Sequence, residues 1–348
     1  MRRAVLTLSL LLVASAAAAQ PLPARIDSLA RAFMTQTGAP SLVVGVTRGG
    51  VRTVAGYGSV GGQTPDAQTR YEIGSVTKAV TSLVLAQAVL RGDVALDTPV
   101  QTLLPDSVRM PIVGRPITLG DLASHTSGLP RLPVPFAPAS FLDPYADFDP
   151  ADLMRAVATA RPDSAGVRYA YSNLGVGLLG YVLARREGGG LATLMQRDVL
   201  VPLGLTATSF EGDVAPPRLT TGIDVAAWSW TDALAGAGAL RSDAADMLTL
   251  AEAVARPERA PALADAIRLA TTPRFTASSR LRLGLAWHLL PGEGPVETVF
   301  HNGATFGSVA FLGVRPGDDL GLVLLSNTGS NGPLDALAGQ ILNALSRP

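Results

Sequence analysis

The chain has 348 residues, of which 47% are hydrophobic and 16% charged, enough apolar material for the buried core of one large domain or two ordinary ones. Its 28 basic and 28 acidic residues cancel, so it has no basic field of the kind that attracts nucleic acid. It contains no cysteine, which excludes disulfides, a thiol nucleophile, a lipoprotein anchor and thiolate metal sites.

The first 19 residues predict a cleaved secretory signal peptide. Arg2 and Arg3 form a positive start, an apolar stretch follows over residues 4–18, and residues 17–19 give an Ala-x-Ala cleavage site before Gln20. An uncleaved N-terminal anchor is the alternative. Cleavage would leave 26 basic against 28 acidic residues, and no later stretch has the length and apolarity of a membrane span. We therefore expect a secreted or periplasmic protein with no integral membrane segment after cleavage.

Both ends of the remaining chain are predicted to supply strands. Apolar residues at three- and four-residue spacing predict a helix over 24–37, ended by Gly38 and Pro40. Two β-rich runs separated by a glycine turn predict a hairpin over 41–47 and 51–57. Towards the other end we expect strands over 281–290, 296–301, 308–314 and 320–326, followed by a helix over 334–345.

The middle of the chain, about residues 75–275, has helical patterns joined by long connections such as the proline-rich segment 130–150. This order predicts an α/β (α+β) fold, with one antiparallel sheet built from both chain ends, flanked by the terminal helices, beside a central mostly helical subdomain. We expect a single domain over 20–348, its sheet part at about 24–70 and 280–348. Catalytic groups are expected in the groove between the two parts.

Basic residues are divided very unevenly: there are 27 arginines and one lysine, Lys78. The segment 75–90 is apolar on every side and predicts a buried helix, in which Ser75 and Lys78 lie one turn apart on the same face. A desolvated lysine can lose its proton and accept one from a serine nucleophile, whereas arginine stays protonated. The alternative is a chance Ser-x-x-Lys pair. The pattern favours Ser75 as nucleophile and Lys78 as base.

Two further segments carry candidate site residues. Tyr171 can shuttle a proton near a cation, and Asn173 can orient a lysine or contact a substrate amide; a tyrosine packed at a helix start is the alternative. His301 could contact a substrate carboxylate or relay a proton. Gly303 would let a substrate backbone approach a strand edge, and the amide of Ala304, with that of Ser75, could form an oxyanion hole.

In this order the three elements resemble the motifs of the serine β-lactamase and penicillin-recognising D,D-peptidase superfamily, above all its class C β-lactamase-like branch of D-alanyl-D-alanine carboxypeptidases, esterases and D-aminopeptidases. Residues 75–78 are similar to its S-x-x-K motif, residues 171–173 to Y-x-N, and residues 301–303 to the H-x-G form of the third motif. Segments 122–130 and 236–247 are similar to two further stretches of this branch. The resemblance covers about residues 24–345.

The resemblance implies an acyl-enzyme on Ser75, with Lys78 and Tyr171 sharing the acid and base roles as a coupled pair. It implies that Asn173 orients Lys78 and the substrate amide, and that water releases the acid. Class C β-lactamases usually have lysine where this chain has His301, a weaker carboxylate anchor. This departure favours a carboxypeptidase or esterase over an efficient β-lactamase.

Other functions remain as alternatives. One is a class C-like β-lactamase, and one from another class is a non-catalytic protein that binds penicillin or peptidoglycan. The three histidines show no metal-ligand spacing and no G-x-S-x-G occurs, so neither a metallohydrolase nor an α/β-hydrolase is favoured. We expect no cofactor, no metal and no nucleic-acid partner, and a small-molecule or peptide substrate. His125 is expected in a structural turn, and Trp228 and Trp230 either line the pocket or pack against the helical part.

Overall fold

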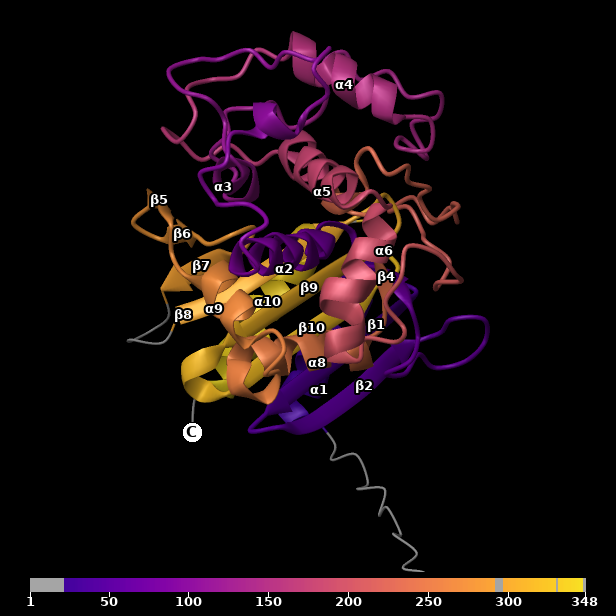
Figure 1. The fold of residues 1–348 in the computed structure, drawn as a ribbon. Helices are drawn as coiled ribbons and strands as arrows, with labels where there is room; N and C mark the ends of the chain where they lie inside the picture. The colour runs from indigo at the N-terminus through magenta and orange to yellow at the C-terminus, as the bar shows by residue number, and fades with distance from the viewer. Residues whose placement is uncertain (1–21, 292–296, 330, 347–348) are drawn as a thin grey trace, which may run out of the picture.

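The computed structural model describes residues 22–291, 297–329 and 331–346, so the predicted signal peptide at residues 1–19 lies outside the described residues. Within them, an eight-stranded antiparallel sheet has the strand order β2-β1-β10-β9-β8-β7-β6-β5 (Figure 1). The strands are β1 (Ser41–Arg48), β2 (Val51–Gly58), β5 (Phe275–Ser278), β6 (Leu281–Leu283), β7 (His288–Pro291), β8 (Glu297–Ala304), β9 (Val309–Arg315) and β10 (Leu320–Ser326). Leu42 of β1 lies opposite Ser326 of β10, so strands from the two ends of the chain pair within one sheet, as the sequence predicts.

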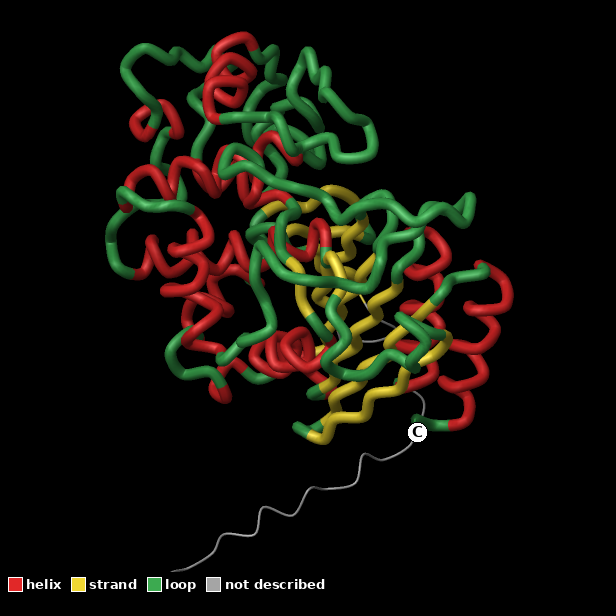
Figure 2. The backbone as a smooth tube through the Cα atoms, turned by 90° about the vertical axis from the view of Figure 1, so that its right-hand side faces the viewer, coloured by secondary structure: helices red, strands yellow, loops and turns green. Residues whose placement is uncertain are grey.

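Two terminal helices cover one face of this sheet. Helix α1 (Ala24–Thr37) ends at Gly38, whose left-handed backbone (φ 64°) suits glycine. Helix α10 (Asn331–Leu345) packs beside it, and both contact strand residues of one parity, such as Val44 and Leu324. Because side chains alternate along a strand, the residues between them point to the other face. Figure 2 shows the strands enclosed by helices on both sides.

The second face packs against helices from the middle of the chain. Helix α8 (Ala244–Ala255) lies on β1 and β10, and an added Cβ at Gly45 would sit 3.1 Å from Leu248 of this helix. Helix α9 (Ala264–Thr271) packs against α2 (Thr77–Leu90). With both faces covered, all seven residues of β9 and of β10 are buried, which explains their nearly continuous apolar sequence.

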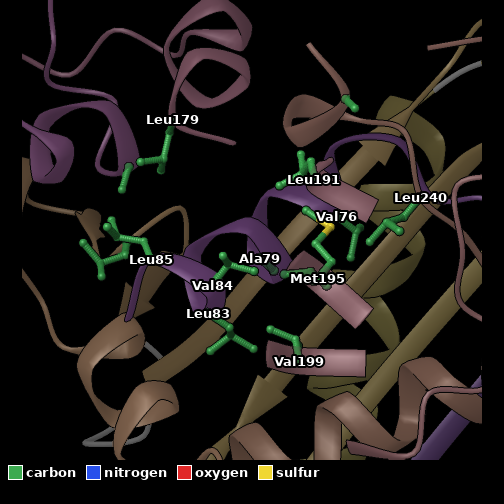
Figure 3. Packing of buried hydrophobic residues seen from close by; sticks show 14 of the residues in the cluster. Val76, Ala79, Leu83, Val84, Leu85, Leu179, Leu191, Met195, Val199 and Leu240 are labelled. Carbon is green, nitrogen blue, oxygen red and sulfur yellow. The ribbon is translucent and has the colours of Figure 1, made fainter. Parts of the chain in front are cut away.

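Helix α2 is central to the helical part. Residues on all its sides are buried, and they belong to one hydrophobic cluster with Leu179, Met195 and Val199 of surrounding elements, part of which Figure 3 shows. The other elements here are α3 (Leu119–Ala123), α4 (Pro150–Thr159), α5 (Asn173–Glu187), α6 (Leu191–Met195), α7 (Val201–Leu203) and a small sheet of β3 (Tyr71–Glu72) with β4 (Arg241–Ser242). Helices α3, α4 and α5 lie above the sheet in Figure 1, with α2 between them and the strands. No helix of the described ranges is long and apolar enough to span a membrane.

The prediction of one strand over 281–290 is wrong. The chain reverses between β6 and β7, where Ala286 has a positive φ of 59° and Gly284 approaches the backbone of Ala270 so closely that an added Cβ would lie 2.3 Å from its carbonyl oxygen. Apolar residues continue through this reversal because Leu285 and Trp287 are themselves buried, and this hides the turn in the sequence. Strand β5, at the sheet edge, was not predicted.

Candidate active site

Ser75 and Lys78 are in direct contact. Ser75 lies in a short 3₁₀ turn, Gly74–Val76, that runs into α2, and Lys78 is in the first turn of that helix. The Lys78 Nζ lies 2.8 Å from the Ser75 Oγ and donates a second hydrogen bond to the backbone carbonyl of Ala237. The serine hydroxyl is thus held against an amine at the point where the helix begins.

The Lys78 side chain is completely buried. Burial, with a smaller contribution from the positive charge of Arg131, lowers the pKa of Lys78 well below its ordinary value. No carboxylate of the described residues forms an ion pair with it, so nothing there restores the charged form. An uncharged amine next to a hydroxyl is able to accept its proton.

Tyr171 stands over this pair, two residues before α5. Ser172 caps α5 by accepting a hydrogen bond from the Gly175 amide at 2.8 Å. This cap fixes the backbone next to Tyr171. The Lys78 Nζ lies 5.1 Å from the centre of the Tyr171 ring. Burial raises the pKa of the phenol well above its usual range, and the Ser75 hydroxyl beside it only partly offsets this shift. The phenol is therefore protonated at neutral pH.

The three histidines of the chain gather around Tyr171. The His125 ring is stacked on it with centroids 4.3 Å apart, and the His288 and His301 centroids lie 6.3 and 6.4 Å away. His125 has a positive φ of 55° and its Nδ1 accepts the Ser172 amide at 3.1 Å. Burial is the main cause that lowers the pKa of all three, to about 4 for His288. The three rings therefore add no positive charge around Lys78 at neutral pH.

The expected contact of His301 with a substrate carboxylate is not supported. The His301 side chain has no exposed surface, and its Nδ1 donates to the Asn302 carbonyl at 2.6 Å. Because alternate residues of β8 point to opposite faces, Phe300 and Asn302 reach the cavity from this strand instead. His301 lies on the Tyr171 side, where the proton-relay expectation remains a prediction.

Asn173 also departs from expectation. The hydrogen bonds of Lys78 go to Ser75 and Ala237, so Asn173 does not orient the lysine. Its side chain lies by the Tyr145 phenol, while its Oδ1 is buried without a partner among the described residues. Asn173 lines the cavity, where a substrate amide could reach it.

Two glycines bring β8 against the turn that carries Ser75. An added Cβ at Gly303 would lie 2.0 Å from the Ile73 carbonyl oxygen, and one at Gly74 would lie 2.8 Å from the Ala304 amide nitrogen. Gly74 also has a positive φ of 47°. The sequence predicts that Gly303 lets a substrate backbone approach the strand. In the structure, the space left by its missing side chain is occupied by the backbone of the Ser75 turn. This packing places the segments that contain the Ser75 and Ala304 amides side by side.

These groups open onto a cavity of about 630 Å³. Its lining residues are Ser75, Arg131, Leu132, Tyr145, Tyr169, Tyr171, Asn173, Trp228, Trp230, Ala237, Gly238, Leu281, His288, Leu290, Phe300, Asn302, Gly303, Ala304 and Asn331. Most of the sequence-predicted site residues are in this set; Lys78 and His301 lie beneath it. The cavity is formed between the sheet strands and the helical part, where the sequence predicts the site.

Aromatic side chains form one wall of the cavity. The Tyr145 and Trp230 rings are stacked with centroids 4.1 Å apart, and Trp228 meets Tyr145 edge-on at 5.2 Å. The buried Glu72, three residues before Ser75, accepts the Trp228 amide at 2.7 Å and the Thr305 hydroxyl at 2.8 Å. Glu72 thus ties the tryptophan loop and the end of β8 to the segment of the nucleophile. Trp228 and Trp230 line the cavity and also pack against the hydrophobic cluster that includes the helical part, so both roles considered for them apply.

Four lining residues, Arg131, Tyr145, Tyr169 and His288, were not singled out from the sequence. The Tyr169 hydroxyl lies 3.1 Å from the His288 Nε2 across the cavity wall. Arg131 directly follows the L-A-S-H-T-S-G-L-P segment, so its place next to a family-like motif is the one signal that could have indicated it. Among the described residues, no group of three or more His, Asp or Glu side chains is arranged to hold a metal ion.

The fold and this site define a member of a known enzyme class. The family model described as Beta-lactamase matches residues 26–346, so the chain belongs to the β-lactamase family of serine hydrolases. It is 27% identical over 317 residues to the D-alanyl-D-alanine-carboxypeptidase/endopeptidase AmpH of Escherichia coli K12, covering 85% of this chain and 81% of that protein.

Solved structures show the same fold. The β-lactamase/D-alanine carboxypeptidase from Pseudomonas syringae superimposes with a TM-score of 0.81 at 21% identity, covering 93% of this chain and 99% of that one. A class C β-lactamase from Rhodobacter sphaeroides gives a TM-score of 0.79 at 24% identity, covering 92% of this chain and 99% of that one. The predicted fold class is thereby confirmed.

Proposed function

We propose that this protein is an exported serine hydrolase that forms an acyl-enzyme on Ser75 and acts on D-amino-acid peptides or esters, in the manner of a D-alanyl-D-alanine carboxypeptidase or esterase. The observation that carries the proposal is the 2.8 Å contact between the Ser75 Oγ and the buried Lys78 amine beside a cavity, where burial lowers the pKa of the lysine. The likeness to a D-alanyl-D-alanine-carboxypeptidase/endopeptidase supports the peptide class.

The acylation step follows from the placement of these groups. The Ser75 Oγ attacks the substrate carbonyl carbon while its proton passes to the Lys78 Nζ. The amides of Ser75 and Ala304 stabilise the negative oxygen of the tetrahedral intermediate. When the intermediate collapses, the leaving group takes a proton through the Tyr171 hydroxyl, which the Lys78 ammonium then reprotonates. Asn173 and the aromatic wall position the substrate.

Deacylation uses the same groups. A water molecule attacks the acyl carbon and gives its proton to the Lys78–Tyr171 pair, and the Ser75 oxygen recovers a proton as the acid leaves. The lysine and the phenol titrate as a coupled pair, so the two roles belong to the pair in each half-reaction. We further propose residues 20–348 as one catalytic domain, delivered outside the cytoplasm by the predicted signal at residues 1–19.

A class C-like β-lactamase is the second candidate, supported by the shared fold. It is less favoured because the third motif offers the buried, uncharged His301 where class C enzymes usually have a cation.

A non-catalytic penicillin- or peptidoglycan-binding protein is the third candidate. The intact Ser75–Lys78 contact argues against it.

One comparison tests all three candidates. The protein lacking residues 1–19 is given nitrocefin, an acyl-D-Ala-D-Ala peptide and a short-chain p-nitrophenyl ester in parallel, with Ser75→Ala as the control. We expect turnover of the peptide or ester that exceeds nitrocefin turnover, and an acyl adduct located on Ser75 by mass spectrometry. Faster nitrocefin turnover would support the β-lactamase, and a stable adduct without turnover the binding protein.

A further inference from the structure

Arg131 brings a positive charge to the cavity. Its side chain is exposed and lines the cavity, with the guanidinium carbon 4.9 Å from the centre of the Tyr171 ring. No ion pair of the described ranges includes it, although exposed arginines elsewhere in this chain are commonly paired. Its guanidinium donors are therefore available to a molecule in the cavity.

The backbone at Arg131 is fixed relative to the catalytic groups. The Arg131 carbonyl accepts the amides of Asn173 and Leu174 at 2.9 and 3.3 Å, which are the first two residues of α5 and have no partner within the helix. Prolines lie on both sides, at positions 130 and 133. The backbone from which the Arg131 guanidinium extends is thus fixed next to Asn173 and the start of α5.

Among the described residues, no acidic side chain lines the cavity to balance this charge. The lining residues include tyrosines, tryptophans, asparagines and apolar side chains, and no aspartate or glutamate. Asp335 of α10 is near, but it lies behind Asn302, whose Nδ2 donates to the Asp335 Oδ2 at 2.7 Å, and it is not part of the lining. A concave site with one sign of charge favours ligands of the opposite sign.

We propose that the Arg131 guanidinium binds a carboxylate of the substrate, and that this enzyme therefore prefers anionic acyl substrates to neutral ones of the same shape. The guanidinium fork matches a carboxylate in two parallel hydrogen bonds. Arg131 would supply the anchor that the buried His301 does not. This inference rests on the proposed acyl-enzyme function and adds the charge of the substrate to it.

Two matched substrate pairs test the proposal. The first is the mono-p-nitrophenyl ester of glutaric acid with its methyl-capped neutral form, and the second an acyl-D-Ala-D-Ala peptide with a free or an amidated C-terminus. Each is measured at the pH of maximal activity of each variant. We expect the wild type to prefer the anionic member of at least one pair by about tenfold or more in kcat/KM, the range of a charge-assisted hydrogen bond.

In Arg131→Gln this preference should fall to about one to threefold, and Arg131→Lys should restore part of it because the charge is kept. Arg161→Gln, an exposed arginine outside the cavity, is the matched control and should keep the full preference. The pair that shows the effect reports which side of the scissile bond carries the carboxylate.

Other outcomes overturn the proposal. If the wild type hydrolyses both members of each pair equally, Arg131 is not a carboxylate anchor, while the proposed acyl-enzyme function stands. If Arg131→Gln lowers kcat for charged and neutral substrates by the same factor, the arginine acts on Tyr171 and Lys78 and not on the substrate. If the wild type hydrolyses none of the four compounds and forms no adduct on Ser75, the proposed function itself fails.

Discussion

Gly303 packs so tightly against Ser75 that a Cβ added to the glycine would lie 2.8 Å from the Ser75 amide nitrogen and 2.0 Å from the Ile73 carbonyl oxygen. Real Cβ atoms do not approach backbone atoms this closely, so any larger residue would push β8 and the nucleophile turn apart. The distance between the two proposed oxyanion donors, the Ser75 and Ala304 amides, therefore depends on residue 303 being a glycine.

Replacing this glycine should damage catalysis more than binding. In Gly303→Ala we expect kcat to fall by about 10²–10³, the loss typical of one displaced oxyanion donor, because the Ala304 amide would move away from the reacting oxygen. Steady-state kinetics with the best ester or peptide measure this. Gly339→Ala on α10, where an added Cβ meets nothing within 4 Å, is the control and should leave kcat unchanged. Equal kinetics of the two variants would contradict the packing argument.

Replacing Lys78 by arginine tests whether catalysis needs a group at this position that can release its proton. Lys78→Arg places a fixed positive group at this position, because a guanidinium does not deprotonate in proteins. We expect the acylation rate to fall by about 10³ or more, which is within the range of a lost general base combined with an unactivated serine. Burst kinetics and intact-mass analysis measure acylation, and a thermal melt of the variant shows whether it is folded. Near-normal acylation in a folded variant would exclude Lys78 as the base.

The acid limb of the pH–rate profile should depend on Arg131. Lys78 acts in its uncharged form, and the nearby Arg131 charge helps to keep its pKa low, after burial as the main cause. Removing that charge in Arg131→Gln raises the pKa of Lys78, so the limb should move to higher pH. The rings of His125, His288 and His301 are uncharged at neutral pH, and the Tyr171 phenol is protonated. None of these groups therefore carries a charge that would cancel the rise in the pKa of Lys78. An unchanged or lower limb in kcat/KM for a neutral ester would contradict the prediction.

Asp121 should make folding stability depend on pH. Burial raises the pKa of this carboxyl, but hydrogen bonds from Arg115 and Thr118 outweigh burial and leave it below the ordinary 3.8. A group whose pKa is lower in the folded state stabilises the fold above its unfolded pKa and loses this effect as pH falls through the folded value. The Tm difference between wild type and Asp121→Asn should therefore be largest above about pH 4 and shrink at lower pH. A difference that is constant from pH 7 to pH 2.5 would contradict the assignment.

This aspartate matters beyond stability because it supports the turn that holds His125. The Asp121 carbonyl accepts the Thr126 amide at 2.9 Å, and its carboxylate is 3.3 Å from the Thr126 hydroxyl. His125, the residue before Thr126, carries the ring stacked on Tyr171. We therefore expect Asp121→Asn to lower kcat by a small factor, about two to fivefold, through Tyr171.

Sequence patterns were sufficient where contacts are local. The Ser75–Lys78 contact spans one helical turn, and the strands at both chain ends have the alternation that a covered sheet requires. The gathering of His125, His288 and His301 around Tyr171 could not be predicted, because these residues are far apart in sequence and no local period joins them. The same holds for Arg131 and for the glycine contact between β8 and the nucleophile turn, since both depend on how irregular segments meet.

The pairing of β1 with β10 has a consequence for the growing chain. A polypeptide that is made from its N-terminus holds Leu42 long before its partner Ser326 exists, so the sheet has to close over a large sequence separation and late in synthesis. The nucleophile turn likewise waits for β8, which follows it by more than two hundred residues. An incomplete chain therefore carries Ser75 and Lys78 without the strand that would complete the oxyanion site, and hydrolytic activity should appear only after nearly the whole polypeptide has folded.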